Sequence, residues 1–102
     1  MLGRENEETE FKKTVSELRE GVISLSSMLN KSGHGIVYFG VKNDGSVFGQ
    51  PAGENTTTKI ANEFKNRLKP AAYPKISVIR ADGKSIISVE AYGEESPYSA
   101  YG

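Results

Sequence analysis

The sequence predicts an α/β domain of the two-layer α+β type, with two helices on one face of a mixed sheet. Two amphipathic segments are typical of helices, and the runs between and after them are rich in the β-branched and aromatic residues of strands. A chain of 102 residues is long enough for one hydrophobic core and too short for two. We therefore predict a single domain over residues 1–102.

The first helix follows a short extended piece at residues 8–12. Thr14 and Glu17 fit a capping box, in which each side chain accepts an N–H group that the first turn leaves unpaired. One apolar stripe then recurs at spacings of three and four, through Val15, Leu18, Val22, Leu25 and Leu29. Gly33 and Gly35 favour an end of this helix near residue 30 or 31.

A central strand is predicted at residues 36–41, which are apolar on both alternating faces. Residues 42–45 have turn chemistry, so residues 46–48 are expected to return as a short hairpin strand. After a loop, Thr56 to Thr58 are expected to cap a second helix that ends before Pro70. Its apolar positions are Ile60, Phe64 and Leu68.

The last two strands form a hairpin around Asp82-Gly83, a preferred two-residue type I′ turn. Pairing Ala81 with Lys84 places apolar residues opposite apolar residues and opposite charges at the far end. The predicted pairs are Val78 with Ile87, Ile76 with Val89 and Lys75 with Glu90. Residues 93–102 show no cap or apolar anchor, and we expect the chain to be a truncated N-terminal fragment of a longer protein.

Composition excludes several functions. No apolar run approaches the roughly 20 residues of a membrane helix, and the acidic first residues do not resemble a signal peptide, so we expect a cytoplasmic protein without a membrane partner. Without cysteine and with one histidine, a zinc site is not expected. Residues 1–10 hold four glutamates and one arginine, which leaves a mild cationic excess on the remaining chain.

Several segments together resemble the Schlafen AlbA_2 domain, and the resemblance covers nearly the whole chain. They are Glu8-Thr9-Glu10-Phe11-Lys12, Asn30 with Gly33 and Gly35, Tyr38-Phe39-Gly40-Val41, Asn43-Asp44-Gly45, Val47-Phe48-Gly49 and Pro97-Tyr98. The resemblance implies an AlbA-like β-α-β-α-β-β order, which agrees with the order predicted from periodicity. It also implies a bacterial protein of several hundred residues, described as a transcriptional regulator, a divergent ATPase or a RecG-like helicase-related protein.

ATP binding, where those longer proteins have it, is expected outside this segment. The sequence has no GxxxxGK[ST] phosphate loop, and the glycines around His34 are too closely spaced and lack the lysine. We expect no ATPase activity from this domain and no bound cofactor.

The leading hypothesis is a nucleic-acid-binding module for DNA or RNA that contacts phosphates and does not read bases. Its candidate residues are Lys12, Lys13, Lys42, Arg80 and Lys84. Arg80 and Lys84 flank the hairpin tip, and the resemblance implies that the hairpin is the arm that reaches along nucleic acid in Alba proteins. Asp82 between them opposes phosphate binding, and for each cation alone a solvated surface role is the simpler interpretation.

Two other classes remain open. Some animal Schlafens cleave RNA with three carboxylates that hold a divalent metal, and Glu5 and Glu10 keep the spacing of two of them. The third position falls on Asn43, with Asp44 beside it, so a nuclease that uses Mg²⁺ or Mn²⁺ is an alternative. Glu5 also fits a solvated acidic terminus, and Glu10 fits a structural pair with a lysine. An exposed sheet edge would instead suit a homodimer or another protein partner.

Three further residues have two interpretations each. His34 either caps the first helix in a glycine turn or touches a phosphate, and local backbone bonding favours the turn. Tyr98 and Tyr101 either stack on bases or lead into the next element of the chain.

Overall fold

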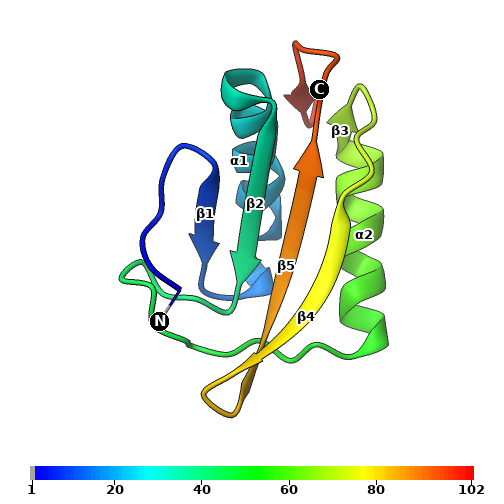
Figure 1. Cartoon of the computed structure of the whole chain (residues 1–102). Helices are drawn as coiled ribbons and strands as arrows, with labels where there is room; N and C mark the ends of the chain where they lie inside the picture. The colour runs from blue at the N-terminus through cyan, green and yellow to red at the C-terminus, as the bar shows by residue number, and fades with distance from the viewer. Residues whose placement is uncertain (1) are drawn as a thin grey trace.

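The computed structural model describes residues 2–102 and contains the predicted mixed sheet (Figure 1). Its strands, in spatial order, are β1 (Thr9–Lys12), β2 (His34–Phe39), β5 (Lys84–Tyr92) and β4 (Lys75–Ala81). β1 is parallel to β2, whereas β5 is antiparallel to both β2 and β4. The predicted α+β class is confirmed.

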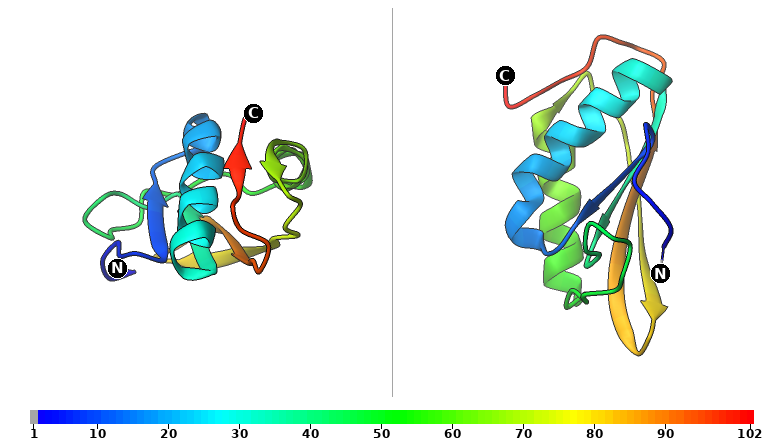
Figure 2. Two further views of the ribbon diagram at one scale, coloured as in Figure 1. Left: turned by 90° about the horizontal axis from the view of Figure 1, so that it is seen from above. Right: turned by 90° about the vertical axis from the view of Figure 1, so that its left-hand side faces the viewer.

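Two helices, α1 (Leu18–Ser32) and α2 (Glu54–Arg67), cover one face of this sheet, as both views in Figure 2 show. Neither helix in the described part of the chain is long and apolar enough to cross a membrane. The domain therefore has two layers, as the alternation of helical and extended segments predicts.

The β4–β5 hairpin has the register that its turn predicts. Ala81 pairs with Lys84, and the three further predicted pairs are all present. Asp82 and Gly83 both have positive φ, 52° and 73°, as a type I′ turn requires. The turn residues and the apolar cross-strand pairs favour the same register. The sequence alone therefore predicted the pairing of β4 with β5 correctly.

The start of α1 differs from the predicted capping box. The Thr14 hydroxyl accepts the N–H of Ser16 at 3.2 Å, but a single 3₁₀ turn, Val15–Glu17, comes before the helix. The Glu17 carboxylate accepts the N–H of Lys13 at 2.9 Å. The helix ends at Ser32, where Gly33 has φ 72° and donates its N–H to the carbonyl of Leu29.

Two predictions between β2 and α2 are wrong. Residues 46–48 form no strand beyond a single bridge between Val41 and Val47, because the N–H groups of Phe48 and Gly49 both turn to the carbonyl of Gly40. The threonines 56–58 do not cap α2, which begins at Glu54 after Gly53. The Thr57 hydroxyl instead donates back to the carbonyl of Glu54 inside the first turn.

Residues 93–102 have an apolar anchor that the sequence did not reveal. Tyr98 is only 6% exposed and belongs to the main core. The side-chain amide of Asn30 donates to the carbonyl of Tyr98 and accepts its N–H. The following residues form β6 (Ser99–Ala100), which pairs with β3 (Leu68–Lys69) in a second, two-stranded sheet. Base stacking by Tyr98 is therefore excluded.

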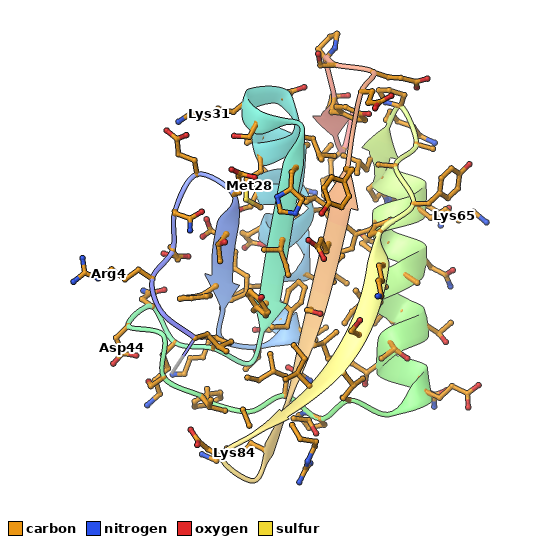
Figure 3. The ribbon with its side chains drawn as sticks, viewed as in Figure 1. Arg4, Met28, Lys31, Asp44, Lys65 and Lys84 are labelled. Carbon is orange, nitrogen blue, oxygen red and sulfur yellow. The ribbon has the colours of Figure 1, made fainter. Side chains whose placement is uncertain are left out.

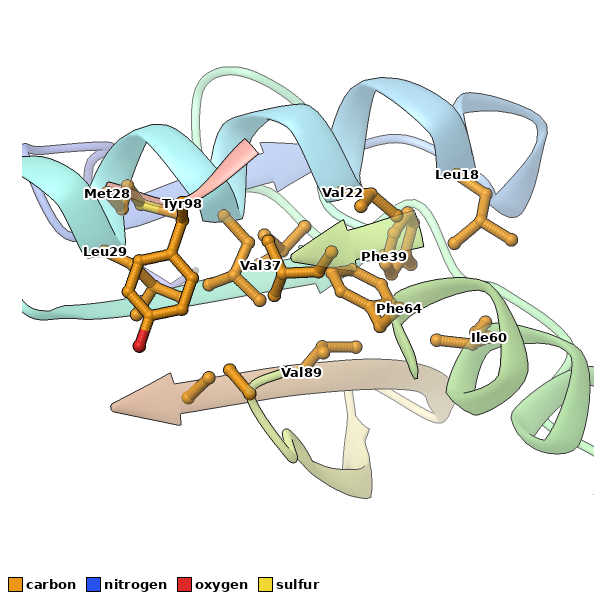
Figure 4. Packing of buried hydrophobic residues seen from close by; sticks show 14 of the residues in the cluster. Leu18, Val22, Met28, Leu29, Val37, Phe39, Ile60, Phe64, Val89 and Tyr98 are labelled. Carbon is orange, nitrogen blue, oxygen red and sulfur yellow. The ribbon is translucent and has the colours of Figure 1, made fainter. Parts of the chain in front are cut away.

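The main hydrophobic core lies between the helices and the sheet (Figure 4). Its labelled members include Leu18, Val22, Leu29, Val37, Phe39, Ile60, Phe64 and Val89, most of which lie at the predicted apolar positions. A smaller cluster of Phe11, Val41 and Ile86 covers the opposite face near the end where the hairpin turns. Both faces of the sheet are thus apolar at this end.

α1 and β2 approach closely because each contributes a glycine to their contact. A Cβ on Gly35 would lie 2.7 Å from Cβ of Met28 and 2.9 Å from a methyl carbon of Leu25. A Cβ on Gly21 would lie 2.7 Å from the ring of Phe39. Real Cβ atoms do not approach other carbon atoms so closely, so glycine is required at both positions.

We expect Gly35→Ala to lower the free energy of unfolding by about 1–3 kcal/mol, because the added methyl group overpacks the contact with Met28. Urea unfolding followed by circular dichroism measures this change. The control, Ser27→Ala, adds no contact at an exposed position of α1 and should stay within about 0.5 kcal/mol of the parent. Equal stability of Gly35→Ala and the parent would contradict the packing argument.

Candidate nucleic-acid interface

Two of the predicted cations share one aromatic ring. The ammonium of Lys13 lies 4.5 Å from the ring centre of Phe48, and that of Lys42 lies 5.8 Å from it. The ring face attracts both charges, although they repel each other. The loop that the sequence mispredicted as a strand thus brings together two lysines that are 29 positions apart in the sequence.

Lys84 reaches the same loop from the hairpin. A Cβ on Gly49 would lie 3.2 Å from Cδ of Lys84, so the aliphatic stem of this lysine packs over the glycine next to Phe48. Figure 3 shows Lys84 beside the turn of the hairpin, at one end of the sheet. We call Lys13, Lys42 and Lys84, arranged around Phe48 and Gly49, the cationic end of the domain.

The other two predicted cations are engaged by the protein itself. The Arg80 guanidinium donates to the Ser85 hydroxyl at 2.9 Å and to the Gly83 carbonyl at 3.1 Å, so it lies along its own hairpin. The Lys12 ammonium lies 3.4 Å from the Glu10 carboxylate, and its side chain is 14% exposed. Both residues are less available to phosphate than the three lysines of the cationic end.

Acidic groups lower the positive charge of the cationic end. Glu17 lines a shallow hollow with Lys13, Lys42 and Asn43. Asp44 is exposed in the adjacent turn, where hydrogen bonds from the Ser46 side chain and N–H lower the pKa of its carboxyl group. Asp44 is therefore ionised at neutral pH, and the net charge here is only weakly positive.

The three carboxylates of the alternative nuclease site are not all together. Glu5 accepts the N–H of Phe11 at 2.7 Å along the outer edge of β1. Burial, followed by a hydrogen bond with Glu5, raises the pKa of Glu10, so these two glutamates do meet. Asp44 lies in a separate loop (Figure 3), and its carboxylate accepts the Ser46 hydroxyl. Within residues 2–102, no three His, Asp or Glu side chains are grouped to hold a metal ion.

His34 does not cap the first helix, because it is the first residue of β2. Its Nδ1 lies 2.7 Å from the Glu8 carboxylate, and its Nε2 lies 2.7 Å from that of Glu90 on β5. The ring packs against Tyr92 with 4.5 Å between ring centres. The bond with Glu90 is the largest cause that raises the pKa of His34, while partial burial opposes it.

The histidine cluster was missed because its members come from three distant segments. Glu90 was expected to face Lys75, which it does as a Cα neighbour, but its carboxylate binds the imidazole. The cross-strand pairing of His34 with Tyr92 depends on the β2–β5 register, which has no local turn to reveal it. The cluster ties the N-terminal segment to the centre of the sheet.

A family comparison agrees with the fold. The model of the family described as "Schlafen, AlbA_2" matches residues 5–101, so the chain belongs to this family. The recognition of this domain from sequence segments is thereby confirmed. No curated protein matches the chain.

Solved structures show the same fold at low sequence identity. The DIP2311 protein from Corynebacterium diphtheriae has a TM-score of 0.73 and 13% identity, over 93% of this chain and 19% of that one. The N-terminal domain of a RecG-related protein, named for an ATP-dependent DNA helicase, from Nitrosomonas europaea has a TM-score of 0.62 and 16% identity. The match covers 89% of this chain and 66% of that one.

We expect the His34 cluster to make stability depend on pH. Because folding raises the pKa of His34, its contribution is fully present below about pH 6.5, the ordinary value, and is lost as pH rises through the folded-state pKa. Urea unfolding from pH 5.5 to 9 should show this loss in the parent. His34→Gln cannot take up the proton and should show a flatter profile, whereas an unchanged slope would refute the assignment.

Proposed function

We propose that this domain binds the phosphate backbone of DNA or RNA with its cationic end. The observation that carries the proposal is the convergence of Lys13, Lys42 and Lys84 from three separate segments around Phe48 and Gly49. The family and the RecG-related neighbour support a role connected with nucleic acids. In a longer protein, the domain would contribute affinity to a transcriptional regulator or a helicase-related enzyme.

The side chains favour backbone contact over base reading. Lysine ammonium groups are mobile point charges that suit phosphate oxygens, whereas base recognition needs fixed bidentate groups such as arginine or amide side chains. Arg80 at the hairpin is already bonded to Ser85 and Gly83. Binding should therefore be weakly dependent on sequence.

The acidic residues beside the cationic end limit the expected affinity for nucleic acid. Glu17 and Asp44 lie beside Lys13 and Lys42, so few net positive charges face a phosphate backbone. Three phosphate contacts on duplex DNA give a log–log salt slope of about −2.7, which corresponds to an affinity loss of about 40-fold between 50 and 200 mM salt. Low affinity and a moderate salt dependence follow from the same small number of contacts.

We expect the triple substitution of Lys13, Lys42 and Lys84 by glutamine to weaken binding at least tenfold at low salt and to flatten the salt slope. The physical reason is the loss of three phosphate contacts, while glutamine keeps the first two methylene groups of each lysine stem. Fluorescence anisotropy of labelled duplex DNA, single-stranded DNA and structured RNA measures both quantities and also reveals any preference among the three.

The matched control replaces Lys59 and Lys65, exposed on α2, and Lys75 by glutamine. This variant removes the same number of positive charges away from the cationic end, so its affinity should stay close to that of the parent. Equal weakening by both triple variants would show that net charge alone drives binding and would overturn the proposed site. A salt-independent affinity would overturn the phosphate contacts.

A further inference from the structure

A hollow on the helix side of the domain is lined by cationic side chains that the sequence did not indicate as candidates. It lies between α1, the last turn of α2 and the small sheet of β3 and β6. Figure 1 places β3 at the end of the domain opposite the hairpin turn. The side chains that line the hollow include those of Arg19, Glu63, Asn66, Arg67, Lys69 and Tyr101.

The ring of Tyr101 lies beside two arginine side chains of this hollow. The guanidinium carbon of Arg19 lies 4.3 Å from the centre of its ring, and that of Arg67 lies 5.8 Å from it. Tyr101 has φ 60°, in the left-handed region that favours glycine, and its N–H donates to the Arg67 carbonyl at 3.1 Å. The backbone is therefore strained at the residue whose ring lies beside two arginines.

The Glu63 carboxylate in the hollow already has partners within the protein. The Tyr101 hydroxyl donates to the Glu63 carboxylate at 2.6 Å, and Nε of Arg67 lies 3.8 Å from the same oxygen. Burial, the hydrogen bond to Glu63 and the charge of Glu63 raise the pKa of Tyr101 to about 12, so the phenol stays a donor. In the described part of the chain, the charges of Arg19 and Lys69 have no carboxylate within ion-pair distance.

We propose that this hollow is a second anion site, which binds a phosphate group through Arg19, Arg67 and Lys69. Guanidinium groups bind phosphate through two parallel N–H donors, and an aromatic face that fixes their planes reduces the entropy lost on binding. The hollow differs from the cationic end, where mobile lysines line an exposed loop. The inference does not depend on the proposed function, because it involves other residues on another side of the fold.

Titration with inorganic phosphate at constant ionic strength tests the site, with amide ¹H–¹⁵N spectra of the whole chain as the readout. We expect saturable shifts at Arg19, Arg67 and Tyr101. The double substitution Arg19→Gln with Lys69→Gln should weaken phosphate binding about tenfold or more, because two charge-assisted contacts are lost. Lys59→Gln, on α2 outside the hollow, is the matched control and should bind phosphate as the parent does.

Two results would overturn the inference. One is the absence of local shifts at the hollow in the parent, and the other is equal phosphate affinity of the parent and the double variant. The amide spectrum of the double variant also shows directly whether it is folded, and Lys69→Gln alone, which leaves the stack on Tyr101 intact, should still weaken binding.

A second series with a dinucleotide, which has a single phosphodiester, identifies the source of the phosphate. Tighter binding of the dinucleotide than of inorganic phosphate at these residues would assign the site to a nucleic-acid backbone. Tighter binding of inorganic phosphate would assign it to a free or terminal phosphate group. The triple lysine variant of the cationic end should behave as the parent in both series, so failure of one site does not imply failure of the other.

Discussion

The close contact between α1 and β2 is the constraint on which the rest of the structure depends. Gly35 has no side chain, so Met28 lies directly against the strand, and Gly21 leaves room for the ring of Phe39 in return. This short separation fixes the end of α1 over the sheet, where Asn30 reaches the backbone of Tyr98. The segment after β5 is thereby held against the core, and β6 can pair with β3. A larger residue at either glycine would move the helix away from all of these partners.

The long strand β5 separates opposite charges between the two ends of the sheet. It begins with Lys84 at the cationic end and approaches its other end with Glu90, which binds His34. Glu8 adds a second carboxylate to the same imidazole, so that even the protonated cluster has a net negative charge. On this face of the sheet, a polyanion would be attracted to the end of β5 at Lys84 and repelled from the end at Glu90. The formal net charge of zero hides this asymmetry.

Local patterns predicted the parts of the fold that local interactions determine. The hairpin register followed from the turn at Asp82 and from apolar pairing, and the apolar stripe located α1. Features set by distant segments were not predictable in this way. The histidine cluster needs the register of two strands that no short turn connects, and burial of Tyr98 needs a hydrogen-bonding partner 68 positions earlier. The threonines at 56–58 do not cap the helix, and the Thr57 hydroxyl instead donates to a carbonyl inside the first helical turn.

The sequence predicted these lysines as candidates for the site, but it could not show which of them are available to bind phosphate. Availability depends on neighbours, since Lys12 is paired with Glu10, whereas Lys13 and Lys42 share an aromatic face. The distinction is electrostatic as well as geometric. A cation paired with a carboxylate must give up that partner before it binds phosphate, whereas a cation above a ring keeps most of its attraction while it binds. Cations held by rings are therefore the better candidates for phosphate contacts, and Phe48 supports the proposed site more directly than the number of lysines does.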